Sequence, residues 1–569
     1  MTSTSELHTI DSVHSAVGHE PSRIHTRPSE DVTRLHREPD EHEDDKPDTS
    51  HGASSATAGG TGPTMKTISK LSPFGCLLSR TLPNYKGPYP VGVFDIEIPV
   101  KEPRSIGSFR HKTLHSPEPG FKLETVLFSV FYPAEAPTMD MNKVVWFPRL
   151  SQTVNGFLKM ARRTSWYYKA LAYPIAAAAI YGTTFPAISE APLRKPPKAN
   201  QQWPLAIFSH GVGCSRLMYS SICGELASRG YVVCAVEHRD GTGPSSALKL
   251  DNGEVKDIDF LDWKDLDWPY LSIQPDNDTT LRKDQLEMRC AEFKEVIDII
   301  KRINAGDPVI QNAIKSPNFD WERWGPKWNA INTNKPIMVG HSLGGSAGLL
   351  AASDTETFQF RSLVVMDPAC QRIEPWNGEI KCPLLVINSE EYTLSSDYPI
   401  LQRIAQSAST PPVYSIAGST HPAFSDVFLI TPNLINKWTG LLADSAEVLD
   451  TTMDIMMAFL RESHQPMRTK TQMIREWTGP LSKPLGDPGD IHWHPVGDET
   501  LLSKTTTRNG ESIPVGNGEN GNDKEHVEVT ERVGSIDEGR ERFDGSIDAK
   551  VVLGDTEEAS KKRDEMVEG

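Results

Sequence analysis

The stretch IMVGHSLGGSAG, residues 337–348, constrains the fold of this 569-residue chain more than any other. Its apolar run, Ile337 to Val339, predicts a short buried strand. The strand leads directly into a glycine-rich turn with Ser342 at its apex, and the following SAGLLAAS is rich in residues that helices accept. The stretch therefore predicts a strand, a sharp turn that carries a hydroxyl, and a helix.

This turn matches the pattern G-x-S-x-G, residues 340–344, known as the nucleophile elbow. A serine there adopts strained backbone angles, so its neighbours must be small enough for strand and helix to approach. The turn lifts the hydroxyl clear of the sheet, and the helix N-terminus behind it favours developing negative charge. An ordinary glycine turn is the alternative, since five residues alone are a weak signal.

A nucleophilic serine needs a base and an orienting carboxylate, which follow it in the order Ser, Asp or Glu, His in proteins built on this turn. Asp367 ends the strand in FRSLVVMDPAC, and Glu390 ends the next strand, so both are candidate acids. His421 follows a further short strand in VYSIAGSTHPAFSD and is the candidate base. Asp367 could instead cap a helix, and His421 could be an ordinary loop residue. We interpret His341, beside Ser342, as a packing residue.

Acyl transfer also needs donors aimed at the oxyanion. The backbone N–H of Leu343, one residue past the serine, is the first candidate. The second comes from PLAIFSHGVGCSR, where a strand is followed by a loop with two glycines, residues 210–213. Such a loop lets backbone N–H groups point inward, so we predict Val212 as the second donor.

Strand and helix patterns alternate through the middle of the chain, which predicts an α/β fold with a mainly parallel sheet and helices on both faces. The expected strands are FDIEIP, TVLFSVFYP, PLAIFSHG, YVVCAVEH, PIMVGHS, RSLVVMD, PLLVIN and PVYSIAG. The clearest helix is QLEMRCAEFKEVIDIIKRI, with Leu286, Phe293 and Ile300 on one face. The stretch 254–280, rich in Asp, Trp and Pro, is expected to be an inserted loop.

The two ends of the chain differ in composition from the middle. Residues 1–60 hold 12 acidic and 5 basic residues, and residues 498–569 hold 19 acidic and 10 basic ones, so the ends carry −16 of the net charge of −17. We expect a disordered N-terminal segment (1–64), one folded domain (65–480) and a disordered acidic tail (481–569). The tail is either solvated filler or a docking segment. No basic patch is evident, so nucleic acid is not an expected partner.

The sequence predicts neither a structural metal nor a disulfide framework. Seven cysteines are scattered and odd in number, which suits a reducing compartment. His492 and His494 form the nearest approach to a metal-binding pattern, and without further ligands we expect them at the surface. No cofactor is implied. The polar N-terminal stretch shows no signal peptide, so a cytoplasmic location is expected.

An insertion at residues 149–182 combines basic residues, Lys159 and Arg162 among them, with apolar ones. Its most apolar piece, from Ala170 to Tyr181, is too short to span a bilayer. Such a mixture is typical of a helix in the lipid headgroup plane, although a cap over the active site fits as well. The residues that we expect to contact a membrane are Phe157, Leu158, Trp166, Tyr167 and Tyr168.

Several separate motifs, in order, make the chain resemble the platelet-activating factor acetylhydrolase family over roughly residues 80–465. They are GPYPVGVFDIEIPV, APLR, FSHGVGCSR with the later EHRD, LRKDQLEMRCAEFKEVIDII, the elbow, VINSE and GSTHPAFSD. The resemblance implies an α/β-hydrolase fold with Ser342 as nucleophile, His421 as base and oxyanion donors at Val212 and Leu343. It also selects Asp367 rather than Glu390 as the acid.

The resemblance further implies calcium-independent hydrolysis of short or oxidised acyl chains at the sn-2 position of phospholipids. The expected partners are therefore a phospholipid substrate and a membrane surface that the protein contacts peripherally. Leu343 and Ser346 depart from the family's pattern near the elbow, which leaves the acyl-chain preference open. A serine esterase of small soluble esters and, less favoured, a non-catalytic interaction protein are the alternative functions.

Overall fold

The computed structural model describes residues 72–113, 119–136, 143–198, 200–249, 255–314, 319–409, 411–461, 474–477, 481 and 484–496. The predicted N-terminal segment and most of the predicted acidic tail lie outside these residues.

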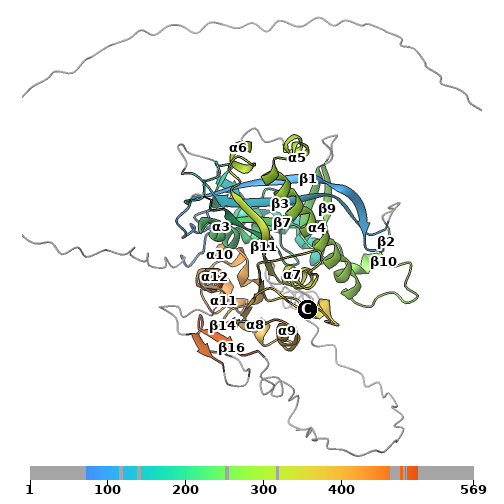
Figure 1. The fold of residues 1–569 in the computed structure, drawn as a ribbon. Coiled ribbons are helices and arrows are strands. Elements are labelled where there is room, and N and C mark those ends of the chain that lie inside the picture. The colour runs from blue at the N-terminus through green and yellow to red at the C-terminus, as the bar shows by residue number, and fades with distance from the viewer. Residues whose placement is uncertain are drawn as a thin grey trace, which may run out of the picture. The chain divides into compact units, whose positions relative to one another are not determined.

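Twelve strands within the described residues form one sheet (Figure 1). In spatial order they are β15 (Ile474–Glu476), β16 (Ile491–His494), β14 (Val413–Ile416), β13 (Leu384–Ser389), β12 (Ser362–Met366), β11 (Ile331–His341), β6 (Trp203–Ser209), β7 (Val232–Glu237), β3 (Phe121–Pro133), β1 (Val91–Ile106), β5 (Thr184–Ser189) and β4 (Lys143–Val145). The six central strands from β14 to β7 pair in parallel, and β3 continues the sheet antiparallel to β7. All eight expected strands are present, and the mainly parallel sheet is confirmed.

Helices cover both faces of the sheet, as predicted. The helices are α1 (Leu150–Met160), α2 (Trp166–Ile180), α3 (Ser220–Ser228), α4 (Thr279–Ala305), α5 (Pro308–Ala313), α6 (Trp321–Trp324), α7 (Leu343–Ser353), α8 (Glu390–Thr393), α9 (Asp397–Gln406), α10 (Val427–Ile430), α11 (Asn433–Trp438) and α12 (Ser445–Arg461). One apolar core lies between the sheet and α4, α7 and α9, and a second lies between the sheet and α3, α10 and α12.

The parallel strands are apolar on both sides because both faces are buried. In β6, Leu205 and Ile207 face the first core, whereas Ala206 and Phe208 face the second. This alternation follows from the pleat of a strand, whose successive side chains point to opposite faces. Strands of this kind read as continuous apolar runs in the sequence.

The predicted amphipathic helix is α4, which crosses the sheet beside β3 and β7 (Figure 1). Leu286, Phe293 and Ile300 are all buried, as their spacing predicts. The helix ends at Gly306, whose φ of +74° forms a left-handed C-cap. The periodicity of α4 therefore placed its buried face correctly.

The stretch predicted as a loop at 254–280 contains regular structure. Strand β9 (Val255–Asp259) pairs with β8 (Ser245–Lys249) in a separate two-stranded sheet, and β10 (Leu266–Asp267) pairs with β2 (Arg110–His111). These strands are short and mostly polar, so their pattern does not distinguish them from a loop.

The predicted end of the domain at residue 480 is also corrected. Strand β16 pairs antiparallel with β14 and buries Ile491, so the folded domain continues to at least this strand. His492 and His494 are buried rather than at the surface. Burial lowers the pKa of His494 to about 3, which keeps the imidazole neutral. The seven cysteines are all free thiols.

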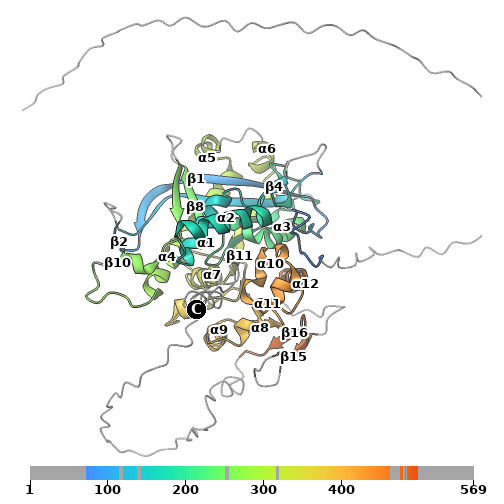
Figure 2. The ribbon, with the colours of Figure 1, turned by 180° about the vertical axis from the view of Figure 1, so that it is seen from behind.

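Helices α1 and α2 lie side by side against the rest of the domain (Figure 2). Gly156 brings α1 against the chain at Pro244, just before β8. A Cβ atom on Gly156 would lie 1.5 Å from the carbonyl oxygen of Pro244. The glycine is therefore required by close backbone approach, not by its backbone angles.

We expect Gly156→Ala to destabilise the protein, although alanine favours a helix by about 1 kcal/mol over glycine. The methyl group forces α1 away from Pro244, and overpacking of this kind costs about 1–3 kcal/mol. Thermal unfolding followed by circular dichroism measures the change. Ser151→Ala, at an exposed position of the same helix, is the control. An unchanged Tm for Gly156→Ala would contradict the close contact.

Candidate active site

Ser342 sits between the end of β11 and the start of α7, in the turn that its motif predicts. Its φ of +56° and ψ of −127° are rare for a residue with a side chain. A Cβ on Gly340 would lie 2.3 Å from the carbonyl oxygen of Gly344, and one on Gly344 would lie 2.2 Å from that of Ser209. Only glycine at both flanking positions permits the turn.

Backbone hydrogen bonds tie the elbow to the end of the neighbouring strand. The N–H of Ser342 donates to the carbonyl of Met366 at 3.0 Å. The carbonyl of Ser342 accepts from Gly345 at 2.9 Å and from Ala369 at 3.2 Å. Since Met366 and Ala369 lie on either side of Asp367, these bonds hold Ser342 close to the candidate acid.

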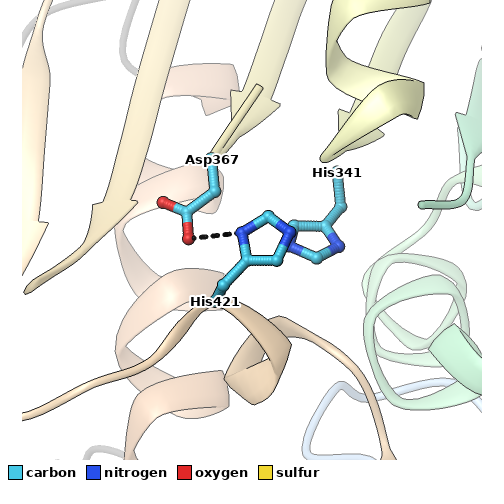
Figure 3. A group of neighbouring side chains, drawn as sticks. All are labelled: His341, Asp367 and His421. Atoms are coloured by element: carbon cyan, nitrogen blue, oxygen red, sulfur yellow. Dashed lines mark hydrogen bonds and ion pairs between the residues drawn. The ribbon is translucent and has the colours of Figure 1, made fainter. Parts of the chain in front are cut away.

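Asp367 follows β12 and is fully buried. Its Oδ1 accepts the backbone N–H of Ser389 at 2.7 Å, and its Oδ2 accepts the Ser389 hydroxyl at 2.6 Å. Oδ2 also faces Nδ1 of His421 at 3.1 Å (Figure 3). Burial raises the pKa of the Asp367 carboxyl, against the opposing effect of its bonds to His421 and Ser389.

His421 opens a short 3₁₀ turn, His421–Phe424, after the loop that follows β14. Its N–H donates to Oε2 of Glu391 at 2.8 Å, which fixes the backbone from which the ring projects. Burial acts to lower the pKa of His421, but the bond to Asp367 and the charges of Asp367 and Glu391 outweigh it. The imidazole pKa therefore lies above its ordinary value of 6.5.

The hydroxyl of Ser342 lies in the same pocket as this pair. Ser342, Asp367 and His421 all line the pocket, together with Gln371, Arg372 and Asp397. Ser342 Oγ is buried and has no hydrogen-bond partner among the described residues. The hydroxyl thus makes no hydrogen bond to His421 here, but a serine that lines one pocket with a carboxylate-oriented imidazole is compatible with a nucleophile and its base.

His341 packs against His421, the candidate base, and the sequence likewise predicts a packing role for it. Its ring centroid lies 4.5 Å from that of His421, and the two rings overlap in Figure 3. Nδ1 of His341 pairs with the Tyr219 hydroxyl at 2.7 Å. Burial, together with the nearby charge of His421, lowers the pKa of His341 well below its ordinary range, so this ring stays neutral.

His341, Asp367 and His421 are also the one group of three within the described residues whose ligand atoms lie close enough for a metal, within 4.8 Å of one another. Nδ1 of His341 is bonded to Tyr219, and Nδ1 of His421 to Asp367. Asp367 and His421 are thus held together by a hydrogen bond, and His341 meets His421 by ring contact.

The predicted oxyanion loop lies directly against the nucleophile. A Cβ on Gly211 would lie 2.9 Å from Cβ of Ser342. The N–H of Gly211 donates to Tyr219 Oη at 3.3 Å, and that of Gly213 donates to the carbonyl of Thr242 at 2.8 Å. Among the described residues, no acceptor is paired with the N–H of Val212 between them. The same holds for Leu343 at the start of α7, so both predicted donors are free.

Glu390, the alternative candidate acid, bonds the backbone and shares no hydrogen bond with His421 among the described residues. Its Oε2 accepts the N–H of Gly418 at 3.0 Å and that of Leu485 at 3.2 Å, which ties down the loop that leads to His421. Sequence reasoning missed Ser389 and Glu391, the residues on either side. Both follow directly from the end of a predicted strand. Side chains at the carboxyl ends of parallel strands meet at one edge of the sheet, so this position could have predicted contacts with Asp367 and His421.

The helices α1 and α2 occupy the predicted insertion. Trp166 and Tyr167 are 79% and 52% exposed, so they are open to solvent. Tyr168 is half-buried, and Phe157 is half-buried against the second core. Leu158 is buried between the two helices, and the prediction that it contacts a membrane is wrong. Its position in the apolar face of α1 serves packing instead.

Two basic residues of the insertion, Arg162 and Lys159, lie close to acidic side chains of the protein. Arg162 pairs with Asp262, and Lys159 lies 3.9 Å from a carboxylate oxygen of Asp259. Both acids lie in or just after β9, within residues 254–280, which were predicted to form a loop. None of the helices in the described ranges has both the length and the apolar character that crossing a bilayer requires.

A search of protein-family profiles matches residues 75–476 to "Platelet-activating factor acetylhydrolase, isoform II". The chain belongs to this family. Within the family, it is 26% identical over 336 residues to the platelet-activating factor acetylhydrolase of Gallus gallus, covering 57% of this chain and 74% of that protein. It is likewise 26% identical over 386 residues to the Cavia porcellus enzyme, covering 67% and 78%.

A Schizosaccharomyces pombe protein named "Putative phospholipase A2" is 25% identical over 454 residues, covering 70% of this chain and 97% of its own length. The family membership and the α/β-hydrolase fold expected from the motifs are thus both confirmed. The matched range contains every residue of the candidate site.

We expect Asp367→Asn to lower kcat by about 10⁴-fold and to shift the acid limb of the kcat/KM profile to lower pH. Asparagine does not hold the proton on Nδ1 of His421, so Nε2 is no longer free to accept the proton of Ser342. It also removes the charge that does most to raise the pKa of His421, so that pKa falls. A base acts when neutral, so the wild-type limb lies above pH 6.5. The pH–rate profile on a chromogenic acetate ester measures both effects.

Glu390→Gln is the control for this experiment, because its side chain still accepts backbone N–H groups and does not contact His421. Its acid limb should stay in place. If Glu390→Gln shifts the limb and Asp367→Asn does not, the acid is assigned to the wrong strand.

Proposed function

We propose that this protein is a serine esterase that hydrolyses the sn-2 acyl ester of phospholipids with short or oxidised acyl chains, without calcium. The observation that carries the proposal is the free Ser342 hydroxyl in one pocket with the bonded pair of Asp367 and His421. The names of the relatives, platelet-activating factor acetylhydrolases and a phospholipase, support a phospholipid as the substrate.

In the first half of the reaction, Ser342 Oγ attacks the ester carbonyl carbon while Nε2 of His421 takes its proton. Asp367 holds the Nδ1–H of the imidazole and stabilises the positive charge that develops on the ring. The carbonyl oxygen becomes an oxyanion, which accepts hydrogen bonds from the N–H groups of Val212 and Leu343. Each such donor contributes about 3 kcal/mol to lowering the barrier.

In the second half, His421 returns the proton to the departing lysophospholipid oxygen, and the acyl group remains on Ser342. A water molecule then gives a proton to His421 and attacks the acyl carbonyl, which releases the fatty acid and restores the serine. Each proton transfer uses a side chain of this protein, so the proposed steps require no calcium.

The lining of the pocket supports a short or oxygenated acyl chain. Beside the triad, the pocket is lined by the polar side chains of Gln371, Arg372 and Asp397 as well as by Ala369 and Tyr392. Burying a long hydrocarbon chain against charged and amide groups costs free energy, because those groups lose hydrogen bonds to water. A short chain, or one that carries oxygen atoms, avoids this cost.

Exposed apolar side chains around α2 support contact with a lipid surface. Helix α2 and the residue that follows it present Trp166, Tyr167, Leu171, Ile175 and Tyr181, all more than 45% exposed. Isolated exposed apolar residues need no explanation, but a group of aromatic and aliphatic side chains on one helix is typical of a membrane-facing surface.

A second group of exposed apolar side chains, on α11, is linked to the first through the segment 72–80. Arg80 donates to the carbonyl oxygen of Tyr181 at 2.8 Å, and the carbonyl of Pro73 accepts the N–H of Asn433, the first residue of α11. The segment 72–80 thus connects α2 to α11. On α11, Leu434 and Trp438 are 81% and 69% exposed.

We expect wild-type protein to release fatty acid from phosphatidylcholines with short or oxidised sn-2 chains, in the presence of a chelator. Ser342→Ala should abolish release, because no other hydroxyl takes the place of the nucleophile. Ser346→Ala, one turn further along α7, is the matched control and should remain active. Cleavage of a soluble ester but of no phospholipid would favour the alternative esterase, and activity in Ser342→Ala would overturn the mechanism.

We also expect the double variant Trp166→Ala with Leu171→Ala to bind phosphatidylcholine vesicles at least tenfold more weakly than the wild type. Each truncated side chain removes apolar surface that would enter the lipid, worth about 25 cal/mol per Å². Vesicle co-sedimentation measures the binding, and kcat on a soluble ester should stay unchanged. Ile273→Ala, at an 84% exposed position outside this surface, is the control. Equal loss in the control would contradict the assignment.

A further inference from the structure

A group of buried polar side chains lies behind the oxyanion loop and takes no direct part in the reaction described above. Arg289 on α4 is at its centre, and it is fully buried, as is Asp240 just after β7. Removing such charges from water is costly, and apolar residues of similar volume often stabilise a protein as well or better. Stability alone therefore does not explain an arginine here.

The guanidinium of Arg289 makes three hydrogen bonds, to three different residues. Nε donates to Asp240 Oδ2 at 2.8 Å, Nη1 to the carbonyl oxygen of His210 at 2.6 Å, and Nη2 to Thr242 Oγ1 at 2.7 Å. The carbonyl of His210 begins the oxyanion loop, residues 210–213. One end of that loop is therefore bonded directly to Arg289.

The other end of the loop is held through Thr242. The N–H and the hydroxyl of Thr242 both donate to Asp240 Oδ1, at 3.0 and 2.5 Å. The carbonyl of Thr242 in turn accepts the N–H of Gly213 at 2.8 Å. Both ends of the loop are thus fixed to the same pair, Arg289 and Asp240, while Val212, next to the Gly211 that packs on Ser342, keeps a free N–H.

A second set of bonds supports the same loop from the adjacent strand. The N–H of His238 donates to Nε2 of His210 at 3.2 Å. The ring of His238 lies between Ser209 Oγ at 2.7 Å and Glu292 Oε2 at 2.5 Å, which copies the order of a catalytic triad. Ser209, His238 and Glu292 are all at most 1% exposed, so we assign this second Ser–His–Glu chain a supporting role for the loop and no contact with substrate.

We propose that Arg289 is a positioning residue that sets the N–H of Val212 in place for the oxyanion. An oxyanion donor is effective only when it is fixed before the charge develops. A planar guanidinium can bond the loop carbonyl, the aspartate and the threonine at once, whereas a lysine ammonium is a point charge on a flexible stem. The inference depends on the proposed esterase mechanism but not on the phospholipid as substrate.

The test is Arg289→Lys, assayed on a soluble chromogenic acetate ester so that it does not depend on the lipid assignment. Lysine keeps the charge and loses the three-way bonding. A donor displaced by about 1 Å costs about 10²-fold in rate. We expect kcat to fall by about that factor, KM to change less than threefold, and the acid limb of the pH profile to stay in place because the His421–Asp367 pair is intact.

Arg323→Lys is the matched control. Arg323 also bonds a backbone carbonyl, that of Leu193, and a carboxylate, that of Asp320, both at 2.8 Å, and it lies outside the oxyanion loop's contacts. Its kcat should stay within twofold of wild type. Equal kcat in Arg289→Lys and wild type, or an equal fall in the two lysine variants, would overturn the proposal.

If Arg289→Lys does not fold, Thr242→Val and Thr242→Ser test the same positioning role. Valine removes the hydroxyl that accepts from Arg289 Nη2 and donates to Asp240 Oδ1, and serine restores it. We expect about a tenfold lower kcat for valine, with an unchanged KM, and recovery with serine. Loss of kcat in both variants, or in neither, would contradict the proposed role. If Ser342→Ala cleaves the ester as well as wild type does, the esterase mechanism itself fails, which is distinct from failure of the Arg289 assignment.

Discussion

The close backbone approach at Ser342 is the constraint on which the rest of the site depends. Gly340 meets the carbonyl of Gly344, and Gly344 meets that of Ser209, at distances that leave no room for a side chain. This contact places the start of α7 against the ends of β11 and β6, so the hydroxyl and the oxyanion loop emerge side by side. The strain of the turn persists because the surrounding bonds to Met366 and Ala369 hold it.

The buried charged groups set different protonation behaviour for the two neighbouring imidazoles, His421 and His341. His421 is the imidazole whose pKa is raised, because it faces Asp367, whereas His341 stays neutral beside it. At the predicted oxyanion loop, the Arg289–Asp240 pair is fully buried. In so low a dielectric, an unpaired charge is costly, so these pairs are fixed in place and the donors that they hold are fixed with them.

The insertion lies close to this machinery through the backbone. Gly156 of α1 packs on the carbonyl of Pro244, and Thr242, two residues earlier, holds Gly213 of the oxyanion loop. The exposed apolar residues of α2 lie on the helix beside α1 (Figure 2). The proposed lipid-contacting surface and the proposed catalytic centre are therefore parts of one packed unit, which suits an enzyme that takes its substrate from a lipid surface.

The sequence by itself determined the alternation of strands and helices, the strained turn at Ser342 and the order of the candidate triad. These features depend on periodicity and turn chemistry within a few neighbouring residues. The residues alone left Asp367 and Glu390 both open as the acid, and only the resemblance chose between them. The tertiary structure decided that Asp367 meets His421 while Glu390 bonds the loop backbone, that Leu158 is buried while Trp166 is exposed, and that β16 completes the sheet beyond residue 480. It also brought Arg289 to Asp240, 49 positions apart. Such pairings depend on where each strand ends and which face each helix covers, and those positions follow only from the packing of the whole domain.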